Sequence, residues 1–242
     1  MTQKMIAQAA EAIILLDDRK ILKRRIAKTY RIPKLDEKLR KLRTRSESKI
    51  MLKLQDKINV PKILHVDEST KEITMDFIKG KKLSDSLESL NWKHIAKKLG
   101  QEIAKIHDLN LIHGDLTTSN LIYVDHSRLN EKICFSQGKS QPIDLNIQTK
   151  NQKPHIQNRR LAFTNNKEDF SIFFIDFGLG FHSSRIEDKA VDLHLLKQAL
   201  EAKHFTIFQD FFKILLDNYN SKDKPKILEQ LKKVEARGRY KH

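Results

Sequence analysis

The chain has 242 residues, of which 39% are hydrophobic and 32% are charged. This composition fits a globular protein with either one large domain or two small lobes. No apolar run approaches the roughly 20 residues of a membrane span, and the run at 12–16 is too short for a signal peptide, so we expect no membrane partner. The single cysteine, Cys134, excludes an internal disulfide and fits a reducing compartment. We expect the protein to be located in the cytoplasm, and a nuclear location also stays open.

The positive charge is concentrated in two segments of the chain. The net charge is +16, and residues 19–53 alone hold fifteen Lys or Arg against three acids. Residues 222–241 hold eight basic residues against three acidic ones. Two basic segments favour a polyanionic partner, with RNA as the first choice. A solvated, lysine-rich surface explains the same pattern about equally well.

The first elements are predicted to be short strands. Residues 4–16 read as two strands around a turn, and the turn is formed by Gln8, Ala9, Ala10, Glu11 and Ala12. A protein kinase places its phosphate-covering loop at this point. The usual glycine pattern is absent, because no glycine precedes Gly80. Backbone N–H groups of such a loop can still face phosphates, although this stretch alone reads equally well as a strand or a helix start.

A strand at 20–25 and a helix at 35–55 follow. Lys23 comes after two apolar residues, the position of a kinase lysine that contacts the α- and β-phosphates, although neighbouring basic residues leave the assignment ambiguous. Glu47 lies inside the cationic helix and is predicted to pair with Lys23. The alternative is a pair within the helix, with Arg43 or Arg45. The apolar face of the helix is expected from residues at helical spacing: Leu35, Leu39, Leu42, Ile50 and Leu54.

Strands are also predicted at 61–66 and 71–78. The second strand runs through Met75, Asp76, Phe77 and Ile78 into Lys79-Gly80, where the composition changes from strand-like to helical. We interpret this segment as a hinge whose backbone groups meet the adenine edge of a nucleotide. The hinge divides the chain into an N-lobe, residues 1–79, and a C-lobe, residues 80–242.

The C-lobe is predicted to be mainly helical. Helices are expected at 82–90, 92–109, 188–202, 205–219 and 225–237, and short strands at 110–112, 121–124 and 171–175. His107 is expected to be a structural residue, and Asp192 either braces the backbone of the neighbouring loop or is a surface acid. Periodicity is lost between about 125 and 169, which we interpret as an inserted loop. Residues 237–242 form a polar, basic tail.

Two motifs carry the chemistry. The segment 112–120 supplies Asp115 and, five residues later, Asn120, and a second segment supplies Asp176 before Phe177-Gly178. Phosphoryl transfer uses one carboxylate near the attacking hydroxyl, and an Asn and an Asp that hold magnesium on the phosphates. The motifs therefore predict an ATP- and Mg²⁺-dependent enzyme. In it, Asp115, Lys23 and Glu47 are catalytic, and Asn120 and Asp176 bind the metal.

The residues 113–120, His-Gly-Asp-Leu-Thr-Thr-Ser-Asn, resemble the signature of the small atypical Ser/Thr kinase/ATPase subunit of the KEOPS (or EKC) complex. Gln8–Ala12 is similar to that family's Gln-Gly-Ala-Glu-Ala loop, with Ala9 in place of glycine. The resemblance covers nearly the whole chain outside about 125–169. Its further matches are Lys23–Arg31 with Pro33, Leu35 and Asp36; Arg43-Thr44 with Glu47; Asp176–Leu179; Glu187–Lys189; Val191–Leu193; and Arg237–Arg239.

The resemblance implies a bilobal, protein-kinase-like α+β fold with a small β-rich N-lobe and a reduced helical C-lobe. It further implies ATP and magnesium binding, autophosphorylation and ATP hydrolysis. It also implies membership in a complex that makes threonylcarbamoyladenosine on tRNA, in which another subunit performs the transfer. The expected partners are that catalytic subunit, the other KEOPS subunits and tRNA.

Two other functions stay open at this point. The basic segments also fit a scaffold that binds tRNA and a partner subunit with little kinase activity. A small-molecule kinase is the third reading, but such kinases usually carry His at the position of Thr117. The short interval from Asp176 to Asp192, without an Ala-Pro-Glu motif, leaves little room for a peptide-docking segment. We therefore expect a dedicated Ser/Thr kinase/ATPase subunit, of the enzyme class named non-specific serine/threonine protein kinase. We do not expect an enzyme that phosphorylates many proteins.

Overall fold

The computed structural model describes residues 4–8, 11–127 and 169–238. The chain divides into two units, one formed by 1–124 with 172–242 and the other by 125–171. Of the second unit, only 125–127 and 169–171 are described. There the backbone N–H of His126 donates to the Asp169 carbonyl at 2.8 Å, and the His126 ring is bonded to the Ser171 hydroxyl. Cys134, most of the expected insertion, Ala9, Ala10 and the end of the tail lie outside the described residues.

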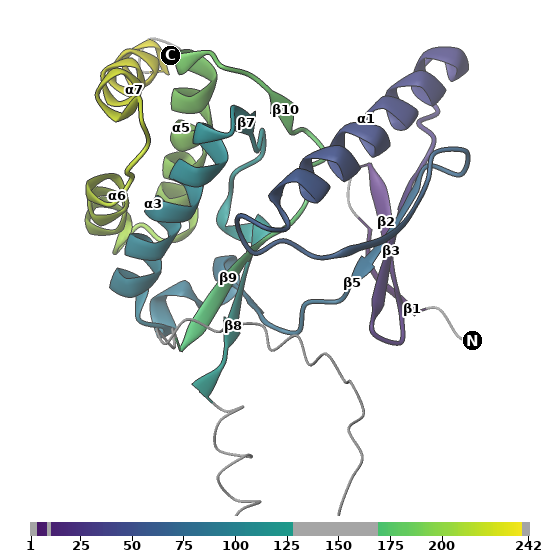
Figure 1. The fold of residues 1–242 in the computed structure, drawn as a ribbon, viewed down its shortest axis with the longest axis horizontal. Helices are drawn as coiled ribbons and strands as arrows, with labels where there is room; N and C mark the ends of the chain where they lie inside the picture. The colour runs from purple at the N-terminus through teal and green to yellow at the C-terminus, as the bar shows by residue number, and fades with distance from the viewer. Residues whose placement is uncertain (1–3, 9–10, 128–168, 239–242) are drawn as a thin grey trace, which may run out of the picture. The chain divides into compact units, whose positions relative to one another are not determined.

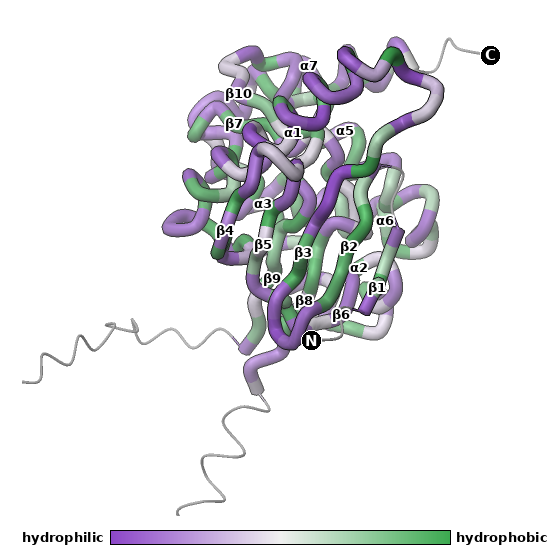
Figure 2. The backbone as a smooth tube through the Cα atoms, turned by 90° about the vertical axis from the view of Figure 1, so that its right-hand side faces the viewer, coloured by the Kyte–Doolittle hydropathy of each residue, from purple (hydrophilic) through white to green (hydrophobic). Residues whose placement is uncertain are grey.

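The N-terminal part of the first unit is an antiparallel five-stranded sheet in the order β1-β2-β3-β5-β4. The strands are β1 (Lys4–Gln8), β2 (Ala12–Asp17), β3 (Lys20–Arg25), β4 (Ile63–Asp67) and β5 (Glu72–Asp76). Figure 2 shows the hydrophobic run of β2 beside the more mixed β3. Because β3 lies between β2 and β5, both of its edges are hydrogen-bonded. This arrangement holds the strand that carries Lys23 rigidly in the sheet.

Helix α1 (Pro33–Leu54) connects β3 to β4 and packs on β4 and β5. Pro33 starts the helix, where its missing N–H and fixed φ have no cost. The expected apolar face is wrong for the first half of the helix. Ile50 and Leu54 are buried, but Leu35 and Leu42 are each 49% exposed. The buried positions of α1 from residue 36 to residue 48 are polar instead, and they are Asp36, Thr44, Glu47 and Ser48.

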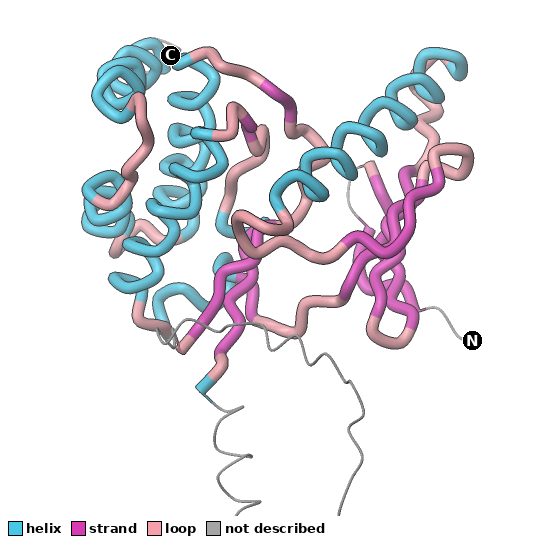
Figure 3. The backbone as a smooth tube through the Cα atoms, in the orientation of Figure 1, coloured by secondary structure: helices cyan, strands magenta, loops and turns pink. Residues whose placement is uncertain are grey.

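The C-terminal part is mainly helical, and Figure 3 shows its helices gathered apart from the strands β1–β5. It contains β6 (Lys81–Lys82), α2 (Leu83–Ser86), the 3₁₀ turn η1 (Leu87–Ser89), α3 (Trp92–Asp108), α5 (Ile186–Lys203), α6 (Phe208–Asp217) and α7 (Lys224–Gly238). Helix α3 packs on α6 and α5 packs on α7. At Gly100 of α3, an added Cβ would lie 2.3 Å from the Leu215 carbonyl oxygen, so glycine permits the close approach of α3 to α6.

Short strands and turns connect these helices to the motif segments. Strands β7 (Leu111–Ile112) and β10 (Phe181–His182) pair with each other. Strands β8 (Leu121–Asp125) and β9 (Phe170–Phe174) belong to a sheet of order β6-β8-β9, and the turn η2 (Thr118–Asn120) precedes β8. The turn and β9 therefore place the two motif segments beside each other. None of the helices in the described ranges has the length and hydropathy needed to cross a bilayer.

Candidate active site

Lys23 lies on the central strand β3, and the lysine is only 6% exposed. Its ammonium nitrogen lies 2.7 Å from Glu47 Oε1 and 2.6 Å from Asp176 Oδ1. Burial alone would lower the pKa of Lys23, but the two carboxylates outweigh burial and raise that pKa above its usual value. The site is therefore built around a fixed, charged lysine.

Glu47 reaches Lys23 from α1 and is fully buried. Its second oxygen, Oε2, accepts a hydrogen bond from Arg25 Nη2 at 2.6 Å. The expected Lys23–Glu47 pair is present, and the alternative partners bind elsewhere. Arg43 pairs with Glu11, and Arg45 pairs with Glu68.

Arg25 is a member of the network that the sequence reasoning missed. It is 5% exposed and lies between Glu47 and Glu11, with Nη1 3.8 Å from Glu11 Oε2. A signal was present in the sequence, because side chains two residues apart on a strand share one face. Lys23 and Arg25 both face α1, whereas Arg24 pairs with Glu72. Each oxygen of Glu47 is thus occupied by a different buried cation.

Asp176 follows β9 with φ of +61°, in the left-handed region that an ordinary residue rarely adopts. Its Oδ1 accepts hydrogen bonds from Lys23 and, at 3.2 Å, from the backbone N–H of Gly178. Burial would raise the pKa of Asp176, but Lys23, together with the Gly178 N–H and Arg25, outweighs burial and holds that pKa below its usual range. A larger residue at 178 would displace the Arg25 or Asp176 side chain, because a Cβ there would lie 2.9 Å from Arg25 Nη2 and from Asp176 Oδ1.

Asp115 and Asn120 face each other across the turn η2. The Asn120 side-chain amide donates to Asp115 Oδ2 and to the Asp115 carbonyl, both at 2.9 Å. The backbone N–H of Ile175 donates to the Asn120 carbonyl at 3.0 Å. The residue before Asp176 is thereby tied to Asn120, and the two motif segments meet although 125–171 forms a separate unit.

Asp192 of α5 fixes the backbone of the Asp115 loop. It is 1% exposed and accepts hydrogen bonds from the N–H groups of His113 and Gly114, each at 2.9 Å. His107 contacts both Asp192 and the Tyr219 hydroxyl, in agreement with the structural role expected for it. Burial opposes ionisation, but the His107 hydrogen bond and nearby donors hold the pKa of Asp192 below its usual range. The bracing of the loop expected for Asp192 is therefore confirmed.

We expect Asp192→Asn to destabilise the protein at neutral pH and to make its free energy of unfolding less dependent on pH in the acid range. A depressed folded-state pKa means that ionised Asp192 stabilises the fold above the unfolded value of about 4. That contribution is lost as pH falls through the lower folded-state pKa. Urea unfolding from neutral pH downward should show wild type and variant converging at acid pH. The matched control is Asp85→Asn, since Asp85 also has a lowered pKa but an exposed side chain. If the difference in unfolding free energy between wild type and Asp192→Asn stayed constant as the pH fell, this account would be contradicted.

The loop predicted to cover phosphates is described at Gln8, Glu11 and Ala12, whereas Ala9 and Ala10 lie outside the described residues. Glu11 points to arginines, with Oε1 3.0 Å from Arg31 Nη2 and Oε2 bonded to Arg43. Its carbonyl also accepts from the Ile26 N–H at 3.2 Å. Glu11 therefore connects this loop to α1 and to the segment after β3, through its side chain and its backbone carbonyl.

The predicted hinge residues lie at the end of β5. Met75 is buried and Phe77 is 40% exposed. The N–H groups of Asp76 and Phe77 donate to the carbonyls of Lys62 and Arg19, each at 2.9 Å. Within the described residues, no backbone hydrogen bond engages the Ile78 N–H. The Ile78 N–H is therefore the donor in this segment that can meet an adenine edge.

Asp176 and Asn120 suit a magnesium ion that also binds phosphates and water better than they suit a metal ion bound by protein groups alone. The described residues contain no group of three His, Cys, Asp or Glu side chains placed to hold a metal ion. Mg²⁺ characteristically binds one or two protein oxygens and completes its shell with phosphates and water. Asp176 suits this role, because its side chain is 41% exposed and no hydrogen bond within the described residues engages its Oδ2. Asn120 supplies a second oxygen-bearing side chain in the adjoining turn.

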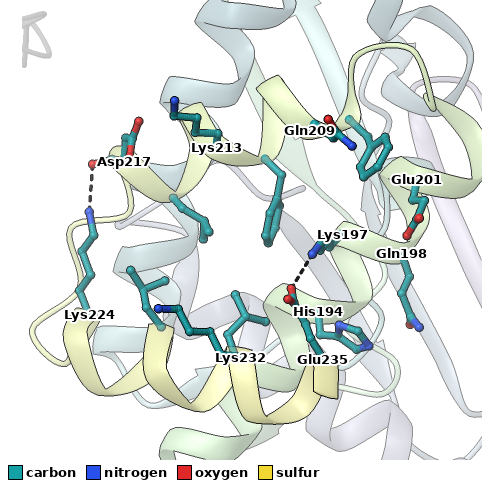
Figure 4. Close-up of a pocket in the computed structure, with 15 residues that line it drawn as sticks. His194, Lys197, Gln198, Glu201, Gln209, Lys213, Asp217, Lys224, Lys232 and Glu235 are labelled. Carbon is teal, nitrogen blue, oxygen red and sulfur yellow. Dashed lines mark hydrogen bonds and ion pairs between the residues drawn. The ribbon is translucent and has the colours of Figure 1, made fainter. Parts of the chain in front are cut away.

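A separate pocket of about 800 Å³ lies among α5, α6 and α7. Figure 4 shows Lys197 and Glu235 pointing toward each other across this pocket, and their ion pair measures 2.7 Å. Lys197 also lies over the Phe212 ring at 5.7 Å. None of the candidate active-site residues lines this pocket. Because this pocket lies apart from those residues, we assign it no part in the proposed phosphotransfer.

Comparison with known proteins defines the class. A model of the RIO domain matches residues 17–137, half of the chain. The Rio2 kinase of Chaetomium thermophilum, solved as an ADP/Mg²⁺-phosphoaspartate complex, superposes with a TM-score of 0.56 over 96% of this chain and 70% of that chain. Because the sequence identity is 14%, this likeness shows the fold alone. The fold is thus that of a RIO-type, kinase-like protein with a β-sheet N-lobe and a helical C-lobe, as expected.

Relatives with similar sequences define the family of this chain more narrowly than the fold does. The KEOPS complex subunit Bud32 of Pyrococcus abyssi is 33% identical over 98% of this chain and 96% of that protein. The chain belongs to the family of this KEOPS complex subunit. The probable bifunctional tRNA threonylcarbamoyladenosine biosynthesis protein of Methanobrevibacter smithii is 34% identical over 100% of this chain. The chain spans only 38% of that longer relative.

Proposed function

We propose that this chain is an ATP- and magnesium-dependent atypical Ser/Thr kinase/ATPase that acts as a KEOPS subunit in threonylcarbamoyladenosine modification of tRNA. The observation that carries the chemical part is the network joining Glu47, Lys23 and Asp176. The adjoining Asp115–Asn120 pair completes a phosphotransfer set. The names of the relatives support the biological part.

Each residue has a proposed role in binding or orienting the reactants. Lys23, fixed by Glu47, would contact the α- and β-phosphates. Asn120 and Asp176 would hold magnesium, which neutralises charge on the phosphates when bound. Asp115 would orient a Ser or Thr hydroxyl, or a water molecule, toward the γ-phosphate. Gln8–Ala12 would cover the phosphates, and the backbone of Met75–Ile78 would meet the adenine.

The path from Asp176 to α5 favours hydrolysis or transfer to a dedicated acceptor. Only residues 179–185 separate Gly178 from the first residue of α5, and β10 pairs with β7 within that interval. A protein kinase normally docks peptide substrates on a longer activation segment. We therefore propose that this chain does not phosphorylate many proteins efficiently.

ATP hydrolysis should be measured with and without the threonylcarbamoyl-transfer subunit and tRNA of the same organism. We expect magnesium-dependent hydrolysis by the chain alone, and a higher rate when both partners are present, because hydrolysis would serve the assembled complex. The matched blank omits magnesium and contains EDTA. If no hydrolysis occurs in any mixture, the enzymatic proposal fails and the scaffold alternative is favoured.

The basic segments favour the second candidate function, a tRNA- and partner-binding scaffold with little kinase activity. Residues 19–53 carry fifteen basic residues against three acids. Contacts to several phosphates release counterions, so tRNA affinity should fall about a hundredfold or more between ~50 and ~200 mM salt. Filter binding or fluorescence anisotropy at several salt concentrations measures this slope. Affinity that does not change with salt would contradict a phosphate-binding role.

A further inference from the structure

Four of the large apolar side chains that the N-lobe leaves in solvent lie just before α1 or in its first half. The exposed fractions are 75% for Tyr30, 71% for Ile32, and 49% for both Leu35 and Leu42. We call these four residues the α1 ridge. In Figure 1 the first turns of α1 lie at the end of the helix farther from α3 and α5. The ridge is therefore not covered by the helices of the C-lobe.

The ridge has the spacing of a packed helix face. Within the ridge, Ile32, Leu35 and Leu42 are separated by three and seven residues, and the half-buried Leu39 lies between the two leucines, which places these side chains on one side of α1. The core-facing side of the same turns is occupied by Asp36, Thr44 and Glu47. Because buried Asp36 pairs with Arg31 and Arg40, and Glu47 pairs with Lys23 and Arg25, the helix cannot rotate its leucines inward without breaking those pairs.

A hydrogen bond joins α1 to the segment that follows Asp176, which carries exposed apolar side chains of its own. One turn after Leu42, the Ser46 hydroxyl donates to the Gly180 carbonyl at 3.1 Å. The two neighbours of Gly180, Leu179 and Phe181, are 50% and 43% exposed. Exposed apolar side chains that gather near one another on a protein often mark an interaction site. These side chains lie at the helix that positions Glu47 and just after Asp176.

The charges around the ridge indicate the chemistry of what binds it. Residues 28–45 hold eight basic residues against two acids, Asp36 and Glu37. Lys34, Lys38 and Lys41 are exposed and lie beside the leucine stripe. A second copy of the chain would bring like charges together, and an RNA would leave the leucines without apolar contacts. An apolar protein surface bordered by carboxylates matches both features.

We propose that the α1 ridge, continued by Leu179 and Phe181, is the docking surface for a folded protein partner that presents apolar side chains bordered by acids. This inference rests on the proposed function, which supplies the transfer subunit as the partner to be tested. A partner on this face would contact α1 and the segment after Asp176 together, and so could set the geometry of the ATP site.

The test measures affinity of the full chain for the purified transfer subunit of the same organism by calorimetry. The double variant Leu35→Ser with Leu42→Ser should weaken binding about tenfold or more, because the apolar centre of an interface carries most of its affinity. The matched control is Leu52→Ser with Leu64→Ser, two leucines of similar exposure away from the ridge, and it should change affinity less than about twofold. Thermal unfolding of each variant is the control that tests whether the fold is retained.

The outcomes separate this inference from the proposed function. If wild type binds the subunit and both double variants bind equally well, the docking surface is wrong and the proposed function stands. If the ridge variant loses affinity for tRNA but not for the subunit, the ridge is an RNA surface and the inference is overturned. If wild type does not bind the subunit at all, the proposed KEOPS role and the docking inference both fail.

Discussion

Asp115→Asn is expected to lower ATP turnover by about 10²- to 10⁴-fold while leaving the fold intact. Asp115 is the carboxylate proposed to orient the attacking hydroxyl or water. An asparagine keeps the shape of the side chain and can still accept the Asn120 hydrogen bond, which measures 2.9 Å in the native protein. It cannot accept a proton as a carboxylate does, so the loss should fall on the rate of turnover rather than on nucleotide binding.

Steady-state ATP hydrolysis, together with equilibrium nucleotide binding, measures the two effects separately. The matched control is Asp210→Asn, which neutralises an exposed carboxylate in the first turn of α6. Turnover of the control should match wild type. Equal turnover in Asp115→Asn and wild type would remove Asp115 from the proposed mechanism, whatever the nucleotide affinity.

Glu47→Gln is expected to destabilise the protein by about 3–5 kcal/mol, because it leaves two buried cations without their shared carboxylate. Lys23 and Arg25 are 6% and 5% exposed, and each binds a different oxygen of Glu47. Asp176 remains as the partner of Lys23, and Glu11 remains as the partner of Arg25 at the longer distance of 3.8 Å. The variant should also bind ATP more weakly, since Lys23 loses the group that orients it.

Thermal unfolding and urea unfolding measure the loss of stability in Glu47→Gln. For a chain of this size, a change of about 3–5 kcal/mol corresponds to a Tm lower by roughly 10 °C. The matched control is Glu68→Gln, which removes another glutamate–arginine pair, with Arg45, at the surface. A surface pair of this kind contributes about 0–1 kcal/mol. Similar Tm shifts in both variants would show that the buried network does not stabilise the fold as described.

Most of the fold could be predicted from the sequence because local patterns determine it. The strand expected at 20–25 is β3, and the helix expected at 92–109 is α3, which begins at Trp92 and ends at Asp108. These elements have regular periodicity and clear ends. The Lys23–Glu47 pair could also be predicted, because Glu47 is the only acid between Glu37 and Asp56 in a cationic stretch and has few possible roles.

The buried face of α1 could not be predicted from periodicity alone. The leucine stripe at 35 and 42 has helical spacing, but hydrophobic spacing does not show that a stripe faces the core. Here the polar side chains turn inward, because Asp36 and Glu47 have arginine and lysine partners on distant segments. Those partners come together only when the sheet forms.

The role of Arg25 and the contacts of Glu11 were missed for a related reason. Glu11 binds arginines that lie 20 and 32 residues further along the chain. Pairs so far apart leave no local pattern, whereas the shared strand face of Lys23 and Arg25 does. The left-handed backbone of Asp176 was also not predictable, since φ values above zero are uncommon for residues other than glycine.

The central claim is that this chain binds ATP through magnesium held by Asp176 and Asn120. Its most direct test is an equilibrium ATP titration of wild type and Asp176→Asn, each with magnesium and with EDTA. We predict that magnesium strengthens ATP binding to wild type about tenfold or more, a difference of about 1.4 kcal/mol, and that Asp176→Asn removes this gain. The same magnesium dependence in both proteins, or no ATP binding by wild type, would contradict the account.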